Sequence, residues 1–510
     1  MTLLNLCLAL PLAGFLLLLA LPRDRHARIR WTSLALSLIV FLVSLGLAVG
    51  FRRADPGFQF VTDVPWVHSP AIQYHVGIDG LSLWLVVLST LLTPIAILIS
   101  WRHIDKRVKE FHAFLLLMEF GLIGVFVALD LFLFYVFWEV SLVPMYFLIG
   151  VWGHERRIYA AVKFFLYTMA GSVLMLAAMV YLYNLAGTFD YAALVEFVAA
   201  GKLAPAEENL LFLAFFIAFA IKVPLFPLHT WLPDAHVEAP TAGSVILASV
   251  MLKMGTYGLA RFCLPLFPAA ARENASWIVV LAIIGIVYGA LVAMVQPNMK
   301  KLVAYSSVSH LGFVVLGIFS FTQIGLDGAV YQMLSHGVST GALFILVGYM
   351  YERRHSLEIA DYGGVASAAP NLAAVFMVTT LASLGLPMLN NFVGEYLVLQ
   401  GAAQANFTWA VYASIGVVLS ACYLLWLYQR VFFGEASEAV RSRVFDLTAR
   451  EWAAILPLVV LMVWMGVASR TFLAPISATN ARIIEQTKQG VVFQARNPVS
   501  PSPMEAANAR

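Results

Sequence analysis

Apolar stretches of about 20 residues, separated by short polar connections, recur along nearly the whole chain. A stretch of about this length is what an α-helix needs to cross the hydrocarbon core of a bilayer. The pattern predicts fourteen membrane-spanning helices, at residues 3–21, 31–51, 81–101, 112–129, 131–152, 158–185, 208–229, 241–265, 276–296, 302–322, 327–351, 371–400, 407–430 and 452–473. The first has no basic residue ahead of its apolar core, so we expect it to stay as a helix rather than to be removed as a signal peptide.

The composition agrees with this pattern. Hydrophobic residues make up 61% of the 510 residues and charged residues only 12%, about half the share found in soluble proteins. An all-α integral membrane protein is therefore predicted. The cysteines Cys7, Cys263 and Cys422 are far apart, and the chain has no glycine-rich nucleotide motif. We expect no iron–sulfur, zinc or nucleotide site here, so the driving energy would come from other chains.

Basic residues are distributed unevenly between the connections. When each connection is numbered by the helix before it, the odd-numbered ones carry eighteen Lys and Arg residues and the even-numbered ones five. Lys and Arg favour the cytoplasmic side of a membrane. We therefore expect the odd-numbered connections in the cytoplasm and both termini on the periplasmic side. The ending "NPVSPSPMEAANAR" is typical of a disordered tail.

Two of the predicted helices are interrupted by proline beside small or polar residues, in "IKVPLFPLHTWLP" and "ASLGLPMLNNFVGE". Pro224 and Pro387 are 163 residues apart, and other features recur at similar offsets. This spacing favours two five-helix repeats, although a string of similar helices could also give such offsets by chance. Because five is odd, the repeats would be inverted in the membrane, as in many ion-moving proteins. The expected division is 1–110 for helices 1–3, 111–266 and 275–435 for the repeats, and 436–510 for the last helix and tail.

The interiors of these helices hold a short set of ionisable side chains. Burial can bring lysine, glutamate and histidine to titrate near neutral pH, whereas arginine stays protonated. The set therefore favours a proton relay. Lys163 is near a helix end and could instead extend to the interface, Glu119 could be a hydrogen-bonding group, and the two histidines could be core residues or haem ligands. The set is Glu119, Glu139, Lys163, Lys222, Lys253, His310, His336 and Glu395.

Lys222 stands at the first proline break. A break frees backbone carbonyls, which water, side chains or neighbouring helices must then satisfy. We expect water to reach Lys222 there and Glu139 to hold its proton by charge attraction. Moving Glu139 away would let Lys222 release that proton.

Six segments carry a resemblance to a known family: "DGLSLWLVVLSTLLTPIAI", "FYVFWEVSLVPMYFLIGVWG", "AAVKFFLYTMAGS", "FAIKVPLFPLHTWLPDAHVEAPTAGSVILASVMLKMGTYGL", "QPNMKKLVAYSSVSHLGF" and "LGLPMLNNFVGE". Over roughly residues 70–475 the chain resembles the antiporter-like membrane subunits of respiratory complex I. Glu395 in the second broken helix is similar to the chain 4 (subunit M) type, whose sibling subunits usually have lysine there.

The resemblance implies a fourteen-helix membrane-arm subunit of NADH:quinone oxidoreductase, with one proton channel and no redox centre. Glu139 and Lys222 would form a modulating pair, Lys253 the central relay group, and Glu395 the group that delivers protons outward. His310 and His336 would continue the path, and His229 would serve on the uptake side. NADH, FMN, iron–sulfur clusters and quinone would belong to partner subunits, which would include two related antiporter-like chains. Lipids would fill the joints, in a bacterial inner membrane.

Three alternatives remain at this point. The chain could be a subunit of a multisubunit cation/proton antiporter, which an ion gradient drives, or of a membrane-bound hydrogenase. It could also be a structural membrane scaffold, although a scaffold gives no reason for buried charges beside broken helices. The genes that accompany it would separate the first two from complex I.

Overall fold

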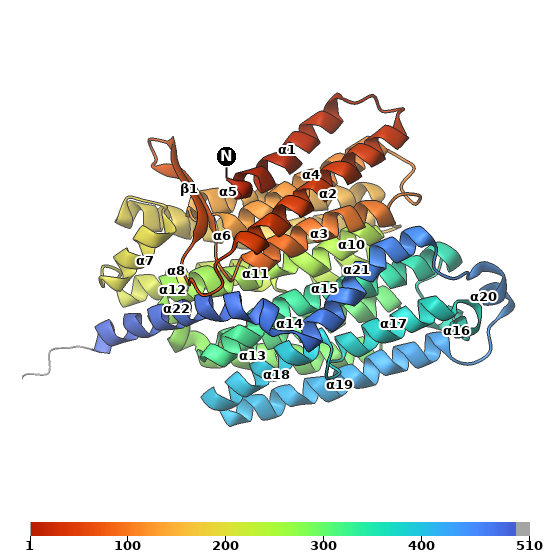
Figure 1. The fold of residues 1–510 in the computed structure, drawn as a ribbon. Coiled ribbons are helices and arrows are strands. Elements are labelled where there is room, and N and C mark those ends of the chain that lie inside the picture. Colours follow the sequence, from red (N-terminus) through yellow and green to blue (C-terminus); the bar gives the residue numbers. More distant parts are fainter. Residues whose placement is uncertain (1, 496–510) are drawn as a thin grey trace, which may run out of the picture.

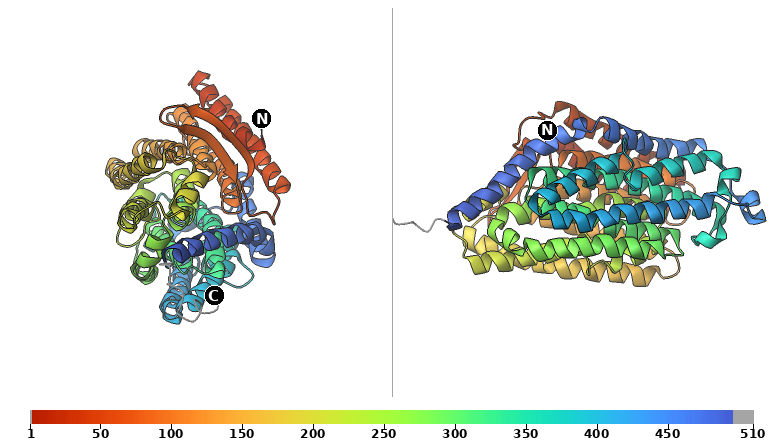
Figure 2. Two further views of the ribbon diagram at one scale, coloured as in Figure 1. Left: turned by 90° about the vertical axis from the view of Figure 1, so that its left-hand side faces the viewer. Right: turned by 90° about the horizontal axis from the view of Figure 1, so that it is seen from below.

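The computed structural model describes residues 2–495, and side chains up to residue 488. Most helices run along one common direction, so the molecule has two ends and a flank parallel to the helices (Figure 1). The view along that direction shows the helices packed around a central group (Figure 2). α15 (Gln323–Arg354) lies in this centre and contacts α3, α10, α14, α17, α18, α21 and α22.

The first part of the chain forms four long helices and one hairpin. The helices are α1 (Leu3–Ala20), α2 (His26–Gly50), α3 (Leu83–Ile99) and α4 (Val108–Val127). Between α2 and α3 lie β1 (Gln59–Val67) and β2 (Ile72–Ile78), which pair antiparallel with two irregularities in register. The hairpin is not predicted by the all-α interpretation, and it covers the end of the molecule where α7 also lies (Figure 1).

The middle of the chain contains the first broken helix. Its elements are α5 (Leu131–Trp152), α6 (Arg157–Ala186), α7 (Tyr191–Ala199), α8 (Pro205–Lys222) and α9 (Trp231–Glu238). The Asp130 carboxylate caps α5 by accepting from the Leu133 amide, and Asp190 caps α7 in the same way. A continuous helical run follows over Thr241–Leu266: α10 (Thr241–Ile246), η1 (Leu247–Met251), α11 (Leu252–Gly258), η2 (Leu259–Cys263) and α12 (Leu264–Leu266). The two η segments are π-helical turns.

The last part holds the second broken helix and a terminal helix that the sequence pattern does not predict. The elements are α13 (Pro268–Met294), α14 (Met299–Ile318), α15, η3 (Ile359–Asp361), α16 (Val365–Ala368), α17 (Pro370–Ser383), α18 (Asn390–Ala405), α19 (Phe407–Phe432), α20 (Glu438–Arg443), α21 (Ala449–Val467) and α22 (Arg470–Ala495). α22 runs obliquely across the bundle towards the hairpin end (Figure 2). The tail predicted to be disordered lies outside the described residues.

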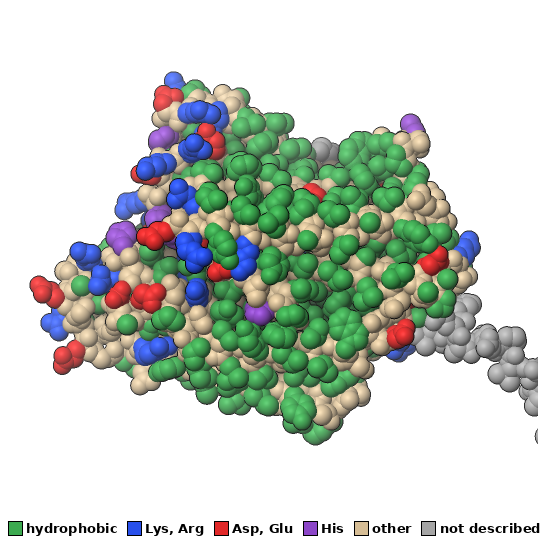
Figure 3. All heavy atoms as spheres, turned by 180° about the vertical axis from the view of Figure 1, so that it is seen from behind, with side chains coloured by type: hydrophobic (Ala, Val, Ile, Leu, Met, Phe, Trp, Pro, Cys, Tyr) green, Lys and Arg blue, Asp and Glu red, His purple; other side chains and the backbone are tan. Residues whose placement is uncertain are grey.

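The outer surface matches a membrane protein. Among the described residues, eleven helices are long and apolar enough to cross a bilayer, and α3 and α17 are shorter apolar helices. Helical segments lie within the predicted spans, and two of these spans are interrupted as predicted, between α8 and α9 and between α17 and α18. One flank shows a broad apolar surface, and charged side chains gather at the end that carries α16 and α20 (Figure 3). The chain is therefore mostly helical and membrane-spanning.

Candidate functional site

Lys253 lies in α11, between the two π-helical turns, and is fully buried. Its Nζ donates to the Ala248 carbonyl at 2.6 Å, and it lies 2.7 Å from Nδ1 of His336 on α15. The Ala248 carbonyl belongs to η1, where the π-helical turn departs from the α-helical hydrogen-bond pattern. π-Helical turns within α-helices are common at functional sites. The helix irregularity and the buried ammonium are therefore parts of one site.

A second close pair lies beside the first. The ring centroids of His336 and His310 are 5.7 Å apart, and His310 Nδ1 is 2.6 Å from Glu395 Oε1. The Gln332 amide also donates to this carboxyl oxygen at 3.1 Å. Lys253, His336, His310 and Glu395 are each at most 3% exposed. Four predicted groups from α11, α15, α14 and α18 therefore form one buried row, which we call the central row.

The hydrogen bonds of the central row restrict its protonation states. A charged Lys253 has only donors, so His336 must accept at Nδ1 and be neutral. The contact between His310 Nδ1 and Glu395 Oε1 holds one proton, which either group can carry. Nε2 of His336 is buried without a hydrogen-bond partner among the described residues. The two rings are neighbours but make no direct hydrogen bond in the described structure, so proton transfer between them needs a bridging group such as water, or a ring rotation.

Lys222 is the last residue of α8 and is 1% exposed. Its Nζ lies 5.3 Å from the centre of the Trp138 ring and 5.4 Å from that of Phe164, which is cation–π range. Glu139 on α5 is the acidic residue whose charge acts on it. Neither Lys222 Nζ nor Glu139 Oε1 has a hydrogen-bond partner in the described part of the chain, so the two groups interact by charge without a direct hydrogen bond between these atoms.

The proline breaks are stabilised by side chains as well as by backbone turns. After α8, the Trp231 indole donates to the Ile221 carbonyl at 2.9 Å. After α17, the Asn391 amide donates to the Ser383 carbonyl at 3.3 Å. Carbonyls freed by an interrupted helix are thus satisfied by groups just beyond each break, which allows a polar interruption to persist inside an apolar bundle.

The three remaining predicted groups lie apart from the central row. Glu119 on α4 is buried, with both carboxyl oxygens lacking a hydrogen-bond partner among the described residues. Lys163 is partly exposed and donates to Asp234 on α9 at 2.7 Å, so it is an ion-paired group near the surface. His229 lies in the first break, with its ring 5.3 Å from that of Tyr288, and neither ring nitrogen has a partner in the described chain.

Sequence reasoning missed two buried groups close to the central row. His236 on α9 is fully buried and stacks on Phe344 at 4.5 Å, and it interacts electrostatically with Lys253. Lys300, at the start of α14, is 1% exposed and donates to the Ala239 carbonyl at 2.7 Å. Both lie in segments that the sequence pattern assigns to connections. The second histidine of "HTWLPDAH", close after the first proline break, is the sequence signal that could have led to His236.

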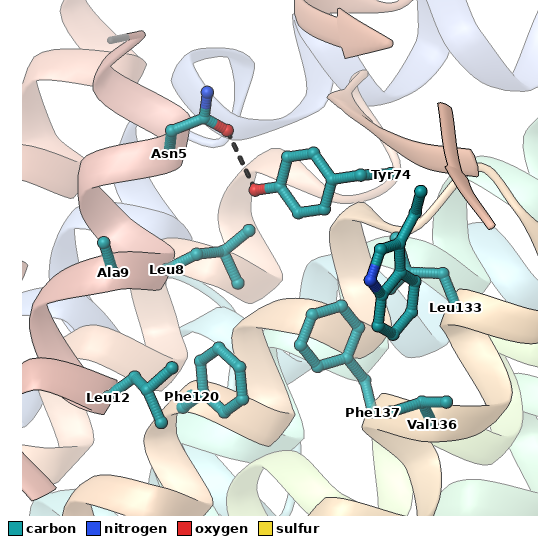
Figure 4. A pocket seen from close by; sticks show the side chains of 10 residues that line it. Asn5, Leu8, Ala9, Leu12, Tyr74, Phe120, Leu133, Val136 and Phe137 are labelled. Atoms are coloured by element: carbon teal, nitrogen blue, oxygen red, sulfur yellow. Dashed lines mark hydrogen bonds between the residues drawn. The ribbon is translucent and has the colours of Figure 1, made fainter. Parts of the chain in front are cut away.

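A separate pocket lies between α1, α4, α5 and the hairpin (Figure 4). The Tyr74 hydroxyl donates to the Asn5 amide oxygen at 3.0 Å across its rim, and the rest of its wall is almost entirely apolar. It contains none of the predicted relay groups. The described residues hold no cluster of three or more His, Cys, Asp or Glu side chains suited to a metal ion. The chemistry of the chain is therefore concentrated in the interior of the bundle.

Two family descriptions match the chain. Residues 128–420 match "NADH:quinone oxidoreductase/Mrp antiporter, TM", and residues 8–128 match "NADH-ubiquinone oxidoreductase chain 4, amino terminus". The chain is 49% identical to NADH-quinone oxidoreductase subunit M of Rhodobacter capsulatus, over 91% of this chain and 93% of that one. It is 42% identical to NADH-ubiquinone oxidoreductase chain 4 of Marchantia polymorpha, over 94% and 96%.

Solved structures are similar over almost the same length. A chain of respiratory complex I from Thermus thermophilus with bound NADH superposes with a TM-score of 0.85 and 35% identity, over 94% of this chain and 99% of that one. A chain of the Mrp complex from Dietzia superposes with a TM-score of 0.83 at 20% identity, covering 96% and 99%. The second likeness is one of fold alone.

Proposed function

The chain belongs to the NADH:quinone oxidoreductase/Mrp antiporter family, and from that premise we propose that it is a proton-translocating membrane-arm subunit of an NADH:quinone oxidoreductase. It would occupy the place that subunit M has in its relatives, beside two related antiporter-like chains. Electron transfer from NADH to quinone, through FMN and iron–sulfur clusters in partner subunits, would supply the energy. The chain itself would move protons and carry no redox centre.

One observation carries this proposal: four buried titratable groups from four helices form the central row, with close contacts of 2.7 Å at one end and 2.6 Å at the other. Ionisable groups are costly inside a membrane bundle and are characteristic of proton paths. Lys253 passes its proton to His336, His310 receives it, and Glu395 accepts it for release. Each group returns to its starting state when the next proton follows, so the net change is one proton moved.

Lys222 and Glu139 regulate this row. The two charges act on one another without a direct hydrogen bond between Lys222 Nζ and Glu139 Oε1, so a small movement of either side chain changes the attraction strongly in the low-dielectric interior. A charge change in a neighbouring subunit would shift Glu139 and weaken its electrostatic attraction to the Lys222 ammonium. Lys222 would then release its proton towards the central row more readily. His229 and Glu119 remain proposed contributors at the break and on α4, and Lys163 is proposed to stabilise α9 through Asp234.

The finer architecture is also part of the proposal. Fourteen spans would form two inverted repeats, residues 111–266 and 275–435, after an N-terminal group at 1–110 and before a C-terminal part at 436–510. Two broken helices support this division. The charged end in Figure 3 would face the bacterial cytoplasm, and both termini the periplasm.

The test uses inverted membrane vesicles that carry the whole complex with Lys253→Ala. NADH oxidation, NADH-driven acidification of the vesicle lumen and assembly on a native gel are measured together. Intact assembly with the loss of both activities supports a relay group coupled to the redox reaction. Unchanged oxidation and acidification would reject this function and favour an antiporter subunit, which sodium-driven proton exchange in the same vesicles would then detect.

A further inference from the structure

Three imidazoles surround Tyr351 at the charged end of the molecule. The Tyr351 hydroxyl lies 3.4 Å from Nδ1 of His154, and the two ring centroids are 5.0 Å apart. The rings of His355 and His103 lie 5.9 Å and 6.5 Å from that of Tyr351. These side chains come from three places: the connection before α4, the connection before α6, and the end of α15. We call them the histidine cluster.

Burial increases step by step from this cluster towards the central row. His103 and His355 are exposed, while His154 and Tyr351 are partly buried. Lys300 is buried behind them and lies close enough to act electrostatically on His103 and His154.

The series continues inward from Lys300. Its charge also acts on the fully buried His236, both of whose ring nitrogens lack a hydrogen-bond partner among the described residues. His236 in turn interacts electrostatically with Lys253 and His336. Titratable groups therefore follow one another from the surface to the relay.

We propose that the histidine cluster is the proton uptake site, or mouth, of this chain and that it protonates the buried Lys300. This inference rests on the proposed function, because it needs a relay to feed. It places proton uptake beside α9, α14 and α15, and not at the break that holds Lys222. Imidazole suits the task, because one ring nitrogen can accept a proton while the other gives one up.

The charges around the cluster order the steps. Burial, together with the Lys300 ammonium, lowers the pKa of His154 to about 4, and the same causes lower the pKa of His103. His154 is therefore neutral while Lys300 is charged. Once Lys300 passes its proton inward, its repulsion is gone while burial still keeps the His154 pKa low, so a proton that His154 takes from water is held weakly and passes on to the Lys300 amine.

Three acidic groups lie near the cluster. Asp105 acts on His103, and Glu155 acts on Tyr351. Glu238 is next to both the cluster and the buried lysine: its carbonyl accepts from the His154 amide at 3.0 Å, and its carboxylate accepts from the Arg156 amide at 2.9 Å. These carboxylates attract protons to the mouth without blocking the imidazoles.

The experiment compares the double variant His103→Gln/His154→Gln with His26→Gln, in inverted vesicles whose exposed face is the cytoplasmic one. His26 is an exposed histidine at the start of α2, at the same end but outside the cluster. NADH-driven acidification is measured in weak buffer at pH 8, with and without added imidazole. We expect a severalfold slower rate in the double variant, recovery with imidazole, and no change in His26→Gln.

Two results would overturn the proposal. One is an unchanged acidification rate in the double variant while Lys253→Ala remains inactive. That result would support the relay but would mean that protons enter it at another site. The other is a loss that imidazole does not restore in a complex that assembles normally, which indicates a structural role. If the double variant fails to assemble, Tyr351→Phe is measured instead, because it keeps the ring and removes the hydroxyl near His154. A slower acidification rate that imidazole restores supports the proposed uptake site. An unchanged rate rejects it.

Discussion

Nδ1 of His336 lies 2.7 Å from the ammonium of Lys253, so a proton can pass between α11 and α15 along one existing hydrogen bond. The contact needs a lysine that can give its proton up. Arginine keeps the positive charge but stays protonated in proteins. We predict that Lys253→Arg assembles and loses NADH-driven acidification by at least about 10²-fold.

The control for this substitution is Lys301→Arg, which changes a partly exposed lysine one position beyond Lys300. Both variants are measured for acidification in inverted vesicles, alongside a native gel. Acidification by Lys253→Arg at the rate of the unaltered complex would mean that charge alone, without proton release, is enough at this position.

Glu395 ends the central row, where its Oε1 lies 2.6 Å from His310 Nδ1 and accepts from the Gln332 amide at 3.1 Å. Glutamine keeps the size of the side chain but cannot hold the transferred proton. We predict that Glu395→Gln blocks proton release and stops acidification. Glu395→Asp should keep a reduced rate of acidification, because the carboxylate remains while the side chain is shorter by one methylene. A glutamine variant that pumps as fast as the aspartate variant would remove Glu395 from the path.

Lys222 has no hydrogen-bond partner in the described chain, and its charge is balanced by Glu139 at a distance. Removing it should therefore disturb control more than folding. We predict that Lys222→Ala assembles but no longer acidifies vesicles. The matched control is Lys163→Ala, which removes a partly exposed lysine paired with Asp234 and should keep most of the activity. An equal loss of acidification in both variants would contradict a controlling role for Lys222 that Lys163 lacks.

The sequence predicted the helical segments well and located the buried ionisable side chains, because both depend on local features; the relay role of those side chains stays a prediction. Twenty-residue apolar runs and proline interruptions are visible without knowing what packs against what, and so are lysine, histidine and glutamate within such runs. The pairing of Lys253 with His336, across 83 residues, comes from the packing of α11 against α15. Spacing alone could not supply it.

The features that escaped prediction depend on distant contacts. Lys300 lies in a predicted connection and Arg261 near the end of a predicted span, yet both are fully enclosed once α14 and η2 are packed. In the hairpin, β2 alternates apolar and polar residues (IQYHVGI) but β1 does not (QFVTDVPWV), so the strand signal is weak beside fourteen longer apolar runs. α22 has a weakly apolar sequence; it packs against α15 and α13 and is joined to the start of α3 by the hydrogen bonds of Gly80 and Trp84.

Asp79 joins α22 to the segment just before α3. Its carboxylate accepts from the Arg261 guanidinium at 2.5 Å and from the Arg482 guanidinium of α22 at 2.9 Å, and the residue is fully buried. Removing one partner of a buried ion pair costs about 3–5 kcal/mol. We predict that Asp79→Asn loosens α22 and lowers the thermal stability of the complex. Asp63→Asn, an exposed change on the hairpin, is the control, and equal melting temperatures for the two variants would contradict the prediction.

The hairpin should respond to pH through His75, whose Nδ1 lies 2.6 Å from the Asp190 carboxylate at the start of α7. The hydrogen bond to Asp190 raises the pKa of His75. Burial acts to raise the pKa of Asp190, but the bond from His75 and the backbone amides lower it overall. The histidine contribution is complete below its unfolded pKa of about 6.5 and is lost as pH rises through the folded value. The aspartate contribution is lost as pH falls through its own lowered value.

The hairpin is therefore held most firmly between about pH 4 and pH 6.5 and should loosen above that range. Hydrogen exchange of the β1 and β2 amides, corrected for the intrinsic effect of pH, measures this directly. We expect protection to fall from pH 6 to pH 9 in the unaltered chain and in His68→Asn, an exposed change near the hairpin turn. In His75→Asn protection should be lower at pH 6 and flat with pH. A pH-dependent loss that persists in His75→Asn would assign the effect to another group.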